Sequence, residues 1–290
     1  MGCFFIFEKK KKKKKIIGLV TCLFFTSLVV AQQKEKVKGS KIVTVVQKDI
    51  AEFNELEVED NLEIFLIKGD KCALEIEADD NLHEFIAINA KGKVLHIGAS
   101  RQISGAKKFS IRVTYTDDFK LLLAKGDTNI TALAELNLTN FTFKIHDNAK
   151  LYANVNAKTF MLMTDDKTKV ELNLKSEDAT IEMSKNSQLK ALISSTQMKF
   201  DMYQKSKAVV EGDVIDFKLR LDNDSDFTGN KLTTKNTELL AEGSSECSVN
   251  VATKLILDAK GKSEIKLYGN QKIEMKNFLD SAVLSKKPLK

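Results

Sequence analysis

The sequence predicts an all-β protein, most of it a parallel β-helix. Val, Ile, Leu, Phe and Thr alternate with polar residues along much of the chain, a period of two that is typical of strands. Only one Pro and no Trp occur among the 290 residues. Segments of about 19 residues also repeat the same apolar pattern. Such a repeat predicts a solenoid, in which each turn buries its apolar side against the turns above and below.

Residues 1–31 have the features of an export signal. Seven lysines, Lys9–Lys15, precede the apolar run Ile16–Ala31, and the small side chains of Val29 and Ala31 precede a cleavage site at Gln32. The apolar run is short for a membrane span. We expect secretion with removal of this signal, and an uncleaved anchor or a lipoprotein is the alternative. After cleavage we expect no transmembrane segment and an extracytoplasmic location, in the periplasm, at the outer surface or secreted.

The net charge of the chain changes when this segment is removed. The chain has 46 Lys and Arg and 40 Asp and Glu, and residues 1–31 hold seven Lys and one Glu, so 39 basic and 39 acidic side chains remain. A neutral mature chain argues against a nucleic-acid partner, because such partners require a basic surface. Two of the four cysteines remain, Cys72 and Cys247, both in the apolar phase of a strand. We expect a buried free thiol at each, and a disulfide between them is the alternative.

The predicted β-helix is preceded by two other regions. Residues 32–41 are predicted to form a flexible leader. Residues 42–118 contain strand and turn patterns, with turns at 68–70 and 91–92, but they do not keep the register of the later repeat. We expect 42–118 to form an irregular N-terminal β region that supplies the first turns and caps the open edges of the sheets.

Residues 119–275 are predicted to form about eight turns of the β-helix, and residues 276–290 a C-terminal tail. The repeats begin at Phe119, Phe141, Phe160, Ala179, Met198, Phe217, Thr237 and Leu255. Their third positions are large, apolar and predicted to point inward: Leu121, Phe143, Leu162, Ile181, Phe200, Leu219, Leu239 and Leu257. The ninth position, after a polar turn, is usually small: Asp127, Ala149, Thr168, Ser187, Ser206, Ser225, Ser245 and Ser263. A second apolar alternation then follows, which is displaced by one residue in the first repeat, to Ile130.

Few residues suggest catalytic or metal chemistry, and we predict no catalytic, cofactor-binding or metal-binding residues. Asp222–Asp226 imitates the start of a calcium loop, but Phe227 and Thr233 stand where such a loop needs Gly and Glu. We interpret it, and the pair Asp165–Asp166, as solvated turns, and a metal site is the alternative. The three histidines have no ligand spacing, and the repeated serines have no partner base; the histidines are His83, His96 and His146.

One outward column of the predicted β-helix indicates whether the chain has the carboxylates that an enzyme on this fold needs. Polysaccharide lyases and hydrolases on this fold need clustered carboxylates on one outer face. The predicted outward column contains Thr142, Met161, Thr180, Lys199, Lys218 and Glu238. This column is mixed in charge, which disfavours an enzyme.

Three stretches of the sequence resemble a known family. They are FNELEVEDNLEIFLIKGDKCALEIEADDNL (53–82), GKVLHIG (92–98) and FSIRVTYTDDFKLLLAKGDTNITA (109–132). They are similar to the bacterial head GIN domain family of proposed auto-transporter adhesins, over roughly residues 45–270. The resemblance implies a signal peptide, a right-handed β-helical domain and surface adhesion, and it implies no catalytic residues.

We therefore expect a non-catalytic, exported protein of the cell envelope. It would bind a surface or a polymer, with a cell-surface glycan or protein as partner and without a cofactor. A carbohydrate-active β-helix enzyme (a polysaccharide lyase or hydrolase) and a purely structural envelope spacer are the alternatives. A cluster of carboxylates on one outer column would favour the enzyme.

Overall fold

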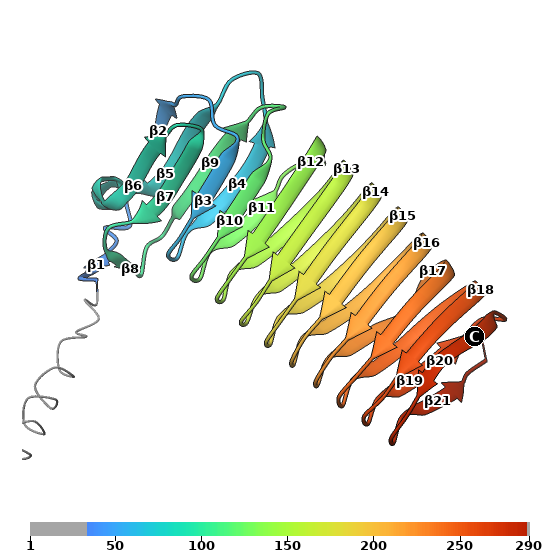
Figure 1. The fold of residues 1–290 in the computed structure, drawn as a ribbon. Coiled ribbons are helices and arrows are strands. Elements are labelled where there is room, and N and C mark those ends of the chain that lie inside the picture. Colours follow the sequence, from blue (N-terminus) through green and yellow to red (C-terminus); the bar gives the residue numbers. More distant parts are fainter. Residues whose placement is uncertain (1–33, 289–290) are drawn as a thin grey trace, which may run out of the picture. The chain divides into compact units, whose positions relative to one another are not determined.

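The structure, a computed structural model, describes residues 34–288, and these are nearly all β. Successive segments stack into a β-solenoid of about nine turns (Figure 1), which confirms the predicted fold class. The predicted export signal, residues 1–31, lies outside the described residues. Between residues 34 and 288, no helix has the length and apolar character that a membrane span requires.

Each regular turn consists mainly of one long strand that bends in its middle. In β13 (Lys150–Thr164), buried and exposed residues alternate up to Ala157, two consecutive exposed residues follow, and the alternation then resumes. The pairing with the next strand skips Lys158 at this point. The shift of phase keeps the apolar side chains inside on both sides of the bend. The other strands of this part are β12 (Leu136–Ile145), β14 (Lys169–Met183), β15 (Gln188–Met202), β16 (Lys207–Leu221), β17 (Asp226–Ala241) and β18 (Glu246–Ala259).

The bend divides every turn into two faces, which we name by their place in β13. Face A comprises Lys150–Ala157 and the paired residues of the other strands, and face B comprises Thr159–Thr164 and its paired residues. Parallel pairing places equivalent inward side chains of successive turns next to each other. On face B it aligns Phe143, Leu162, Ile181, Phe200, Leu219, Leu239 and Leu257. These residues are buried, which confirms the inward positions predicted from the second repeat onward.

The first repeat is displaced by one residue from its predicted alignment. Leu122, not Leu121, pairs with Phe143, and Leu122 is fully buried. Phe119, which suggested the alignment, packs its ring against Phe141 with centroids 5.0 Å apart. The prediction for Leu121 was therefore wrong, because the aromatic contact between the two repeats does not follow the strand register. The ninth position is likewise Thr128 rather than Asp127, since Lys150 N bonds to Thr128 O as Lys169 N bonds to Ala149 O.

A four-residue turn joins face B to face A of the next repeat. Its second residue has a positive φ: Asp147, Asp166, Lys185, Gln204, Asn223, Gly243, Gly261 and Asp280. Backbone bonds between turns hold this edge, for example Lys167 N to Asp147 O at 2.7 Å. The fourth residue of the turn points inward, and it is fully or almost fully buried in Thr168, Ser187, Ser206, Ser225, Ser245 and Ser263. Within residues 34–288 these six hydroxyls have no hydrogen-bond partner.

The N-terminal region adds turns in an order that differs from the chain order. β3 (Glu55–Val58) and β4 (Glu63–Lys68) pair in parallel with β10 (Leu121–Ala124) and β11 (Asn129–Ala132). On their other side they pair in parallel with two later strands, β7 (Val94–Ala99) and β9 (Phe109–Tyr115). The region thus contains two turns of parallel strands, stacked out of sequence order.

Antiparallel strands close the N-terminal end of the solenoid (Figure 1). The strands beyond β7 and β9 are β6 (Ile86–Lys91), which pairs with β7, β5 (Ala73–Asp79), which pairs with β9, and β2 (Val43–Asp49), which pairs with β5. The 3₁₀-helix η1 (Asp80–Phe85) buries Leu82 completely. In the predicted leader, β1 (Lys36–Lys38) pairs in parallel with β8 (Gln102–Ser104).

The C-terminal end is built differently. The last strands are β19 (Glu264–Tyr268), β20 (Lys272–Phe278) and β21 (Val283–Lys286). β20 pairs with β18, and β21 pairs with β19. Within the described residues, no strand lies beyond β20 or β21. Every residue of β20 is exposed.

Candidate functional site

The acidic turn residues that the sequence singles out form ion pairs along one edge of the solenoid. Asp165 lies between His146, whose Nδ1 is 3.0 Å from Asp165 Oδ1, and Lys185. Lys185 Nζ donates to Asp166 Oδ1 at 2.8 Å. This hydrogen bond raises the pKa of Lys185 and lowers the pKa of Asp166. The group is a surface network of compensating charges that joins three successive turns.

The second acidic turn, Asp222–Asp226, does not gather its carboxylates. Asp222 accepts a hydrogen bond from the backbone N–H of Asn223, and Asp226 lies at the start of β17, 4.0 Å from Lys207 Nζ. Ser225 of this turn is inward-facing and buried. No group of three or more His, Cys, Asp or Glu side chains that could hold a metal ion occurs between residues 34 and 288.

The remaining residues singled out by the sequence have structural positions. Cys72 and Cys247 are free and buried, and burial raises the pKa of the Cys247 thiol to about 12. An inert buried thiol fits this environment. The predicted outward column from Thr142 to Glu238 is aligned by the strand register. Its acidic end pairs with a basic neighbour, since Lys218 Nζ is 4.0 Å from Glu238.

A shallow groove of about 480 Å³ lies on the outer side of face A, across β11 and β13–β16. Tyr152 is 41% exposed there, and Leu192 and Val209 are 54% and 44% exposed. Strand alternation produces this exposure, because outward positions of face A carry these large side chains while their neighbours Ala153 and Ala191 face the core. The groove therefore has an apolar, partly aromatic surface.

Polar side chains border the same groove. Asn173 Nδ2 donates to Asn154 Oδ1 at 2.6 Å across adjacent turns, which leaves other amide atoms of the pair for a ligand. Glu171, Lys190 and Glu211 also line the groove. This combination of an aromatic ring, amides and charges of both signs can contact a ligand that has apolar faces and many hydroxyl groups.

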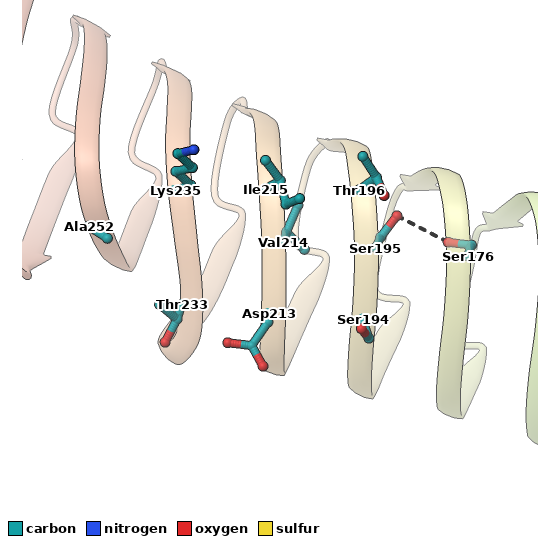
Figure 2. A pocket seen from close by; sticks show the side chains of 10 residues that line it. All are labelled: Ser176, Ser194, Ser195, Thr196, Asp213, Val214, Ile215, Thr233, Lys235 and Ala252. Atoms are coloured by element: carbon teal, nitrogen blue, oxygen red, sulfur yellow. Dashed lines mark hydrogen bonds between the residues drawn. The ribbon is translucent and has the colours of Figure 1, made fainter.

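A second groove of about 370 Å³ lies at the bend beside face A (Figure 2). Ser194, Asp213 and Thr233 line it from three successive strands, and Lys235 and Ile215 lie further along those strands. The buried Ser195 also lines this groove, and hydrogen bonds hold its hydroxyl in place. Its one hydroxyl hydrogen is within reach of two acceptors, the carbonyl oxygens of Gln197 at 2.8 Å and Glu177 at 3.2 Å, and its oxygen accepts from Ser176 Oγ at 3.1 Å.

The two grooves adjoin on the same side of the solenoid. Leu192 of the first groove and Ser194 of the second are two residues apart on β15, and Glu211 and Asp213 are two residues apart on β16. Residues two apart in a strand face the same side. We call the joined surface, from Tyr152 to Lys235, the face A groove. The outward column considered from the sequence lies on face B, so that prediction missed these residues. The signal that could have found them is the large apolar side chains at outward positions of face A.

A family model matches most of the chain. It is the model described as "Putative auto-transporter adhesin, head GIN domain", and it matches residues 52–173 and 161–270. No curated protein matches the chain. The family match therefore agrees with the resemblance inferred from the sequence.

Solved bacterial structures share the fold. Two, each named a "putative adhesin", are from Parabacteroides merdae (15% identity, TM-score 0.63, 87% of this chain and 99% of that chain) and Parabacteroides distasonis (16%, 0.63, 87% and 100%). A third, also from Parabacteroides distasonis, is named a "putative lipid binding protein" (14%, 0.59, 87% and 100%). At these identities the comparison supports the fold alone.

Proposed function

The chain belongs to the head GIN domain family, and from this premise we propose that it is a non-catalytic adhesin of the cell envelope that binds glycan chains in the face A groove. The observation that carries this proposal is the juxtaposition of the exposed Tyr152 ring with the amides of Asn154 and Asn173. Aromatic rings pack against the apolar faces of sugars, and amides and hydroxyls satisfy the sugar hydroxyl groups.

The shape and charge of the groove support a polymer as ligand. The groove crosses several successive strands of face A, so an extended ligand that lies along it would contact side chains from several turns of the solenoid. A repeating polymer could engage several of these positions, each weakly, and the contacts would add through effective concentration. Lys190 lies among Glu171 and Glu211, and such a mixed surface does not favour a nucleic acid, whose phosphates require a basic patch.

The location follows from the same proposal. An adhesin acts outside the cytoplasm, and the predicted export signal in residues 1–31 supplies a route there. We therefore propose that the protein is exported, and that it acts in the periplasm, at the outer surface or as a secreted protein.

A glycan array with the purified protein tests this function, followed by titration of the bound glycan with two variants. Tyr152→Ala should weaken binding by about tenfold or more, which corresponds to about 1.4 kcal/mol. Tyr203→Ala is the matched control, because Tyr203 is also a partly exposed tyrosine but lies at the turn edge under the Arg220 guanidinium.

Three other results would contradict the proposal and favour a different function or site. Shortening or unsaturation of the glycan during incubation would identify the carbohydrate-active enzyme. Absence of binding to any glycan on the array would favour the structural spacer. Equal loss of binding in both tyrosine variants would place the ligand elsewhere on the protein.

A further inference from the structure

The C-terminal end exposes the apolar interior of the solenoid. The strand register places Ile273, Met275 and Phe278 of β20 beside the buried Leu255, Leu257 and Ala259 of β18, at inward positions. Inward residues of earlier turns are buried, yet these three are 40%, 49% and 37% exposed. Leu279 and Val283 add further exposed apolar surface.

Two strand edges are open at this end as well. Within residues 34–288, β20 on face B and β21 on face A each have a neighbour on one side only. Open edges present a row of unpaired N–H and C=O groups, and they template pairing with another chain. The N-terminal end also has open strand edges, in β2 and β6, but there antiparallel strands and Leu82 already cover the interior.

We propose that this open end binds the same end of a second copy of the chain, forming a two-fold symmetric dimer. A two-fold axis perpendicular to the two faces superimposes β20 on β20 of the partner and β21 on β21 of the partner, antiparallel in both cases. Both open edges are then paired in one step, because each copy carries its two edges at the same separation. The exposed inward side chains of the two copies meet and complete a continuous core.

The charges of β20 are complementary to themselves in this arrangement. In an antiparallel pair, residues directly opposite each other point to the same side. A pairing centred on Ile273 places Lys272 of each copy opposite Glu274 of the other. A pairing centred on Met275 would bring Lys276, which the register with β18 skips, near Glu274 of the other copy. The alternative centred on Glu274 would oppose like charges, which is unfavourable.

The proposed dimer has a consequence for adhesion, which rests on the function proposed above. A two-fold axis perpendicular to the faces leaves the outer side of face A pointing the same way in both copies. Two face A grooves would then meet one surface together, and their avidity would exceed the affinity of either groove alone.

Disulfide trapping tests the contact directly. In a chain with Cys3 and Cys22 replaced by Ser, either Ile273→Cys or Met275→Cys should give a covalent dimer on mild oxidation, because centred antiparallel pairs have Cα atoms close enough for a disulfide. The native Cys72 and Cys247 are buried and do not interfere. Val45→Cys is the control, since Val45 is 57% exposed on the opposite edge, in β2.

Sedimentation of the unmodified protein over a concentration series provides a second measurement. We expect a monomer–dimer equilibrium that Met275→Glu weakens by about tenfold or more, since the dimer would bury an unpaired charge, and that Val45→Glu leaves unchanged. A monomer at every concentration would overturn the proposal. So would oligomers that only Val45→Glu disrupts, or crosslinking through Val45→Cys instead of the β20 cysteines.

Discussion

The two ends of the solenoid differ in how far they cover its apolar interior. At the N-terminal end the chain turns back, so that strands of later sequence stack outside β3 and β4, and antiparallel strands then cover them. At the C-terminal end the repeat stops at β20 and β21 with its inward side chains exposed. Adding turns therefore buries the apolar side of every turn except the last, and closing an end requires a departure from the repeat.

The largest expected difference in stability between the ends is that between two variants, each of which replaces a leucine at one end with aspartate. Leu82→Asp should reduce the free energy of unfolding by about 3–5 kcal/mol, because it buries an unpaired carboxylate in a fully buried position. Leu279→Asp should cost less than about 1 kcal/mol, because Leu279 is 54% exposed. Urea unfolding at low protein concentration, where the proposed dimer dissociates, measures both. A similar loss in the two variants would show that the C-terminal end is closed in solution.

A smaller contrast in stability is expected between Asp79, near the N-terminal end, and Asp280, at the C-terminal end. The carboxylate of each accepts hydrogen bonds from backbone N–H groups. Asp79 is fully buried and accepts bonds from the backbone of Lys41, Lys107 and Lys108 at 2.8–3.1 Å. It thereby ties the segment after β1 to the loop before β9. Burial raises the pKa of Asp79, but the three N–H donors and the Lys41 charge bring it below its ordinary value.

The lowered pKa of Asp79 determines how the stability of the fold depends on pH. A carboxyl whose pKa is lower in the folded state stabilises the fold above its unfolded pKa of about 3.9, and this contribution is lost as the pH falls toward the folded value. Asp79→Asn should lower the melting temperature at pH 7 and reduce the difference between pH 7 and pH 3. The control is Asp280→Asn at the open end, where the exposed Asp280 Oδ2 accepts from Gly261 N at 3.0 Å. Equal pH profiles for Asp79→Asn and the unmodified protein would contradict the assignment.

The contrast between the ends also explains what could be predicted from the sequence. The turns from β12 to β18 repeat at a nearly constant spacing, so each inward residue was predictable from the one before it. The N-terminal turns were not, because the pairing of β3 with both β10 and β7 joins segments that are far apart in sequence and share no period. The shift at Leu122 has the same origin, since β10 lies where the out-of-order turns meet the regular ones.

The candidate site was harder to predict than the fold. The repeat specifies which residues point outward, and strand register confirms one such column on face B. It does not specify which outer face holds a groove, because that depends on the relative heights of neighbouring side chains across several turns. Tyr152 and Leu192 became informative only when the register placed them on one surface with Asn154 and Asn173.

The smallest expected effects are those of the inward hydroxyls at the turn edge, and they too differ between the ends. Thr128, beside the N-terminal turns, donates its hydroxyl hydrogen to a carbonyl oxygen, with those of Lys125 and Asp60 within reach. The hydroxyl of Ser206, in the regular turns, is buried without a partner among the described residues, and Ala282 fills the equivalent position in the last turn.

Substituting these two hydroxyls should therefore have opposite signs. Thr128→Val should cost about 1 kcal/mol, because it removes a satisfied buried donor and leaves two carbonyl groups with fewer partners. Ser206→Ala should leave stability unchanged or raise it by up to about 1 kcal/mol, because a buried hydroxyl without a partner is itself unfavourable. Thermal unfolding of both variants against the unmodified protein measures the difference. A clear loss of stability in Ser206→Ala would mean that the hydroxyls of the regular turns have partners, such as buried water, and that this edge is equally well satisfied along the whole solenoid.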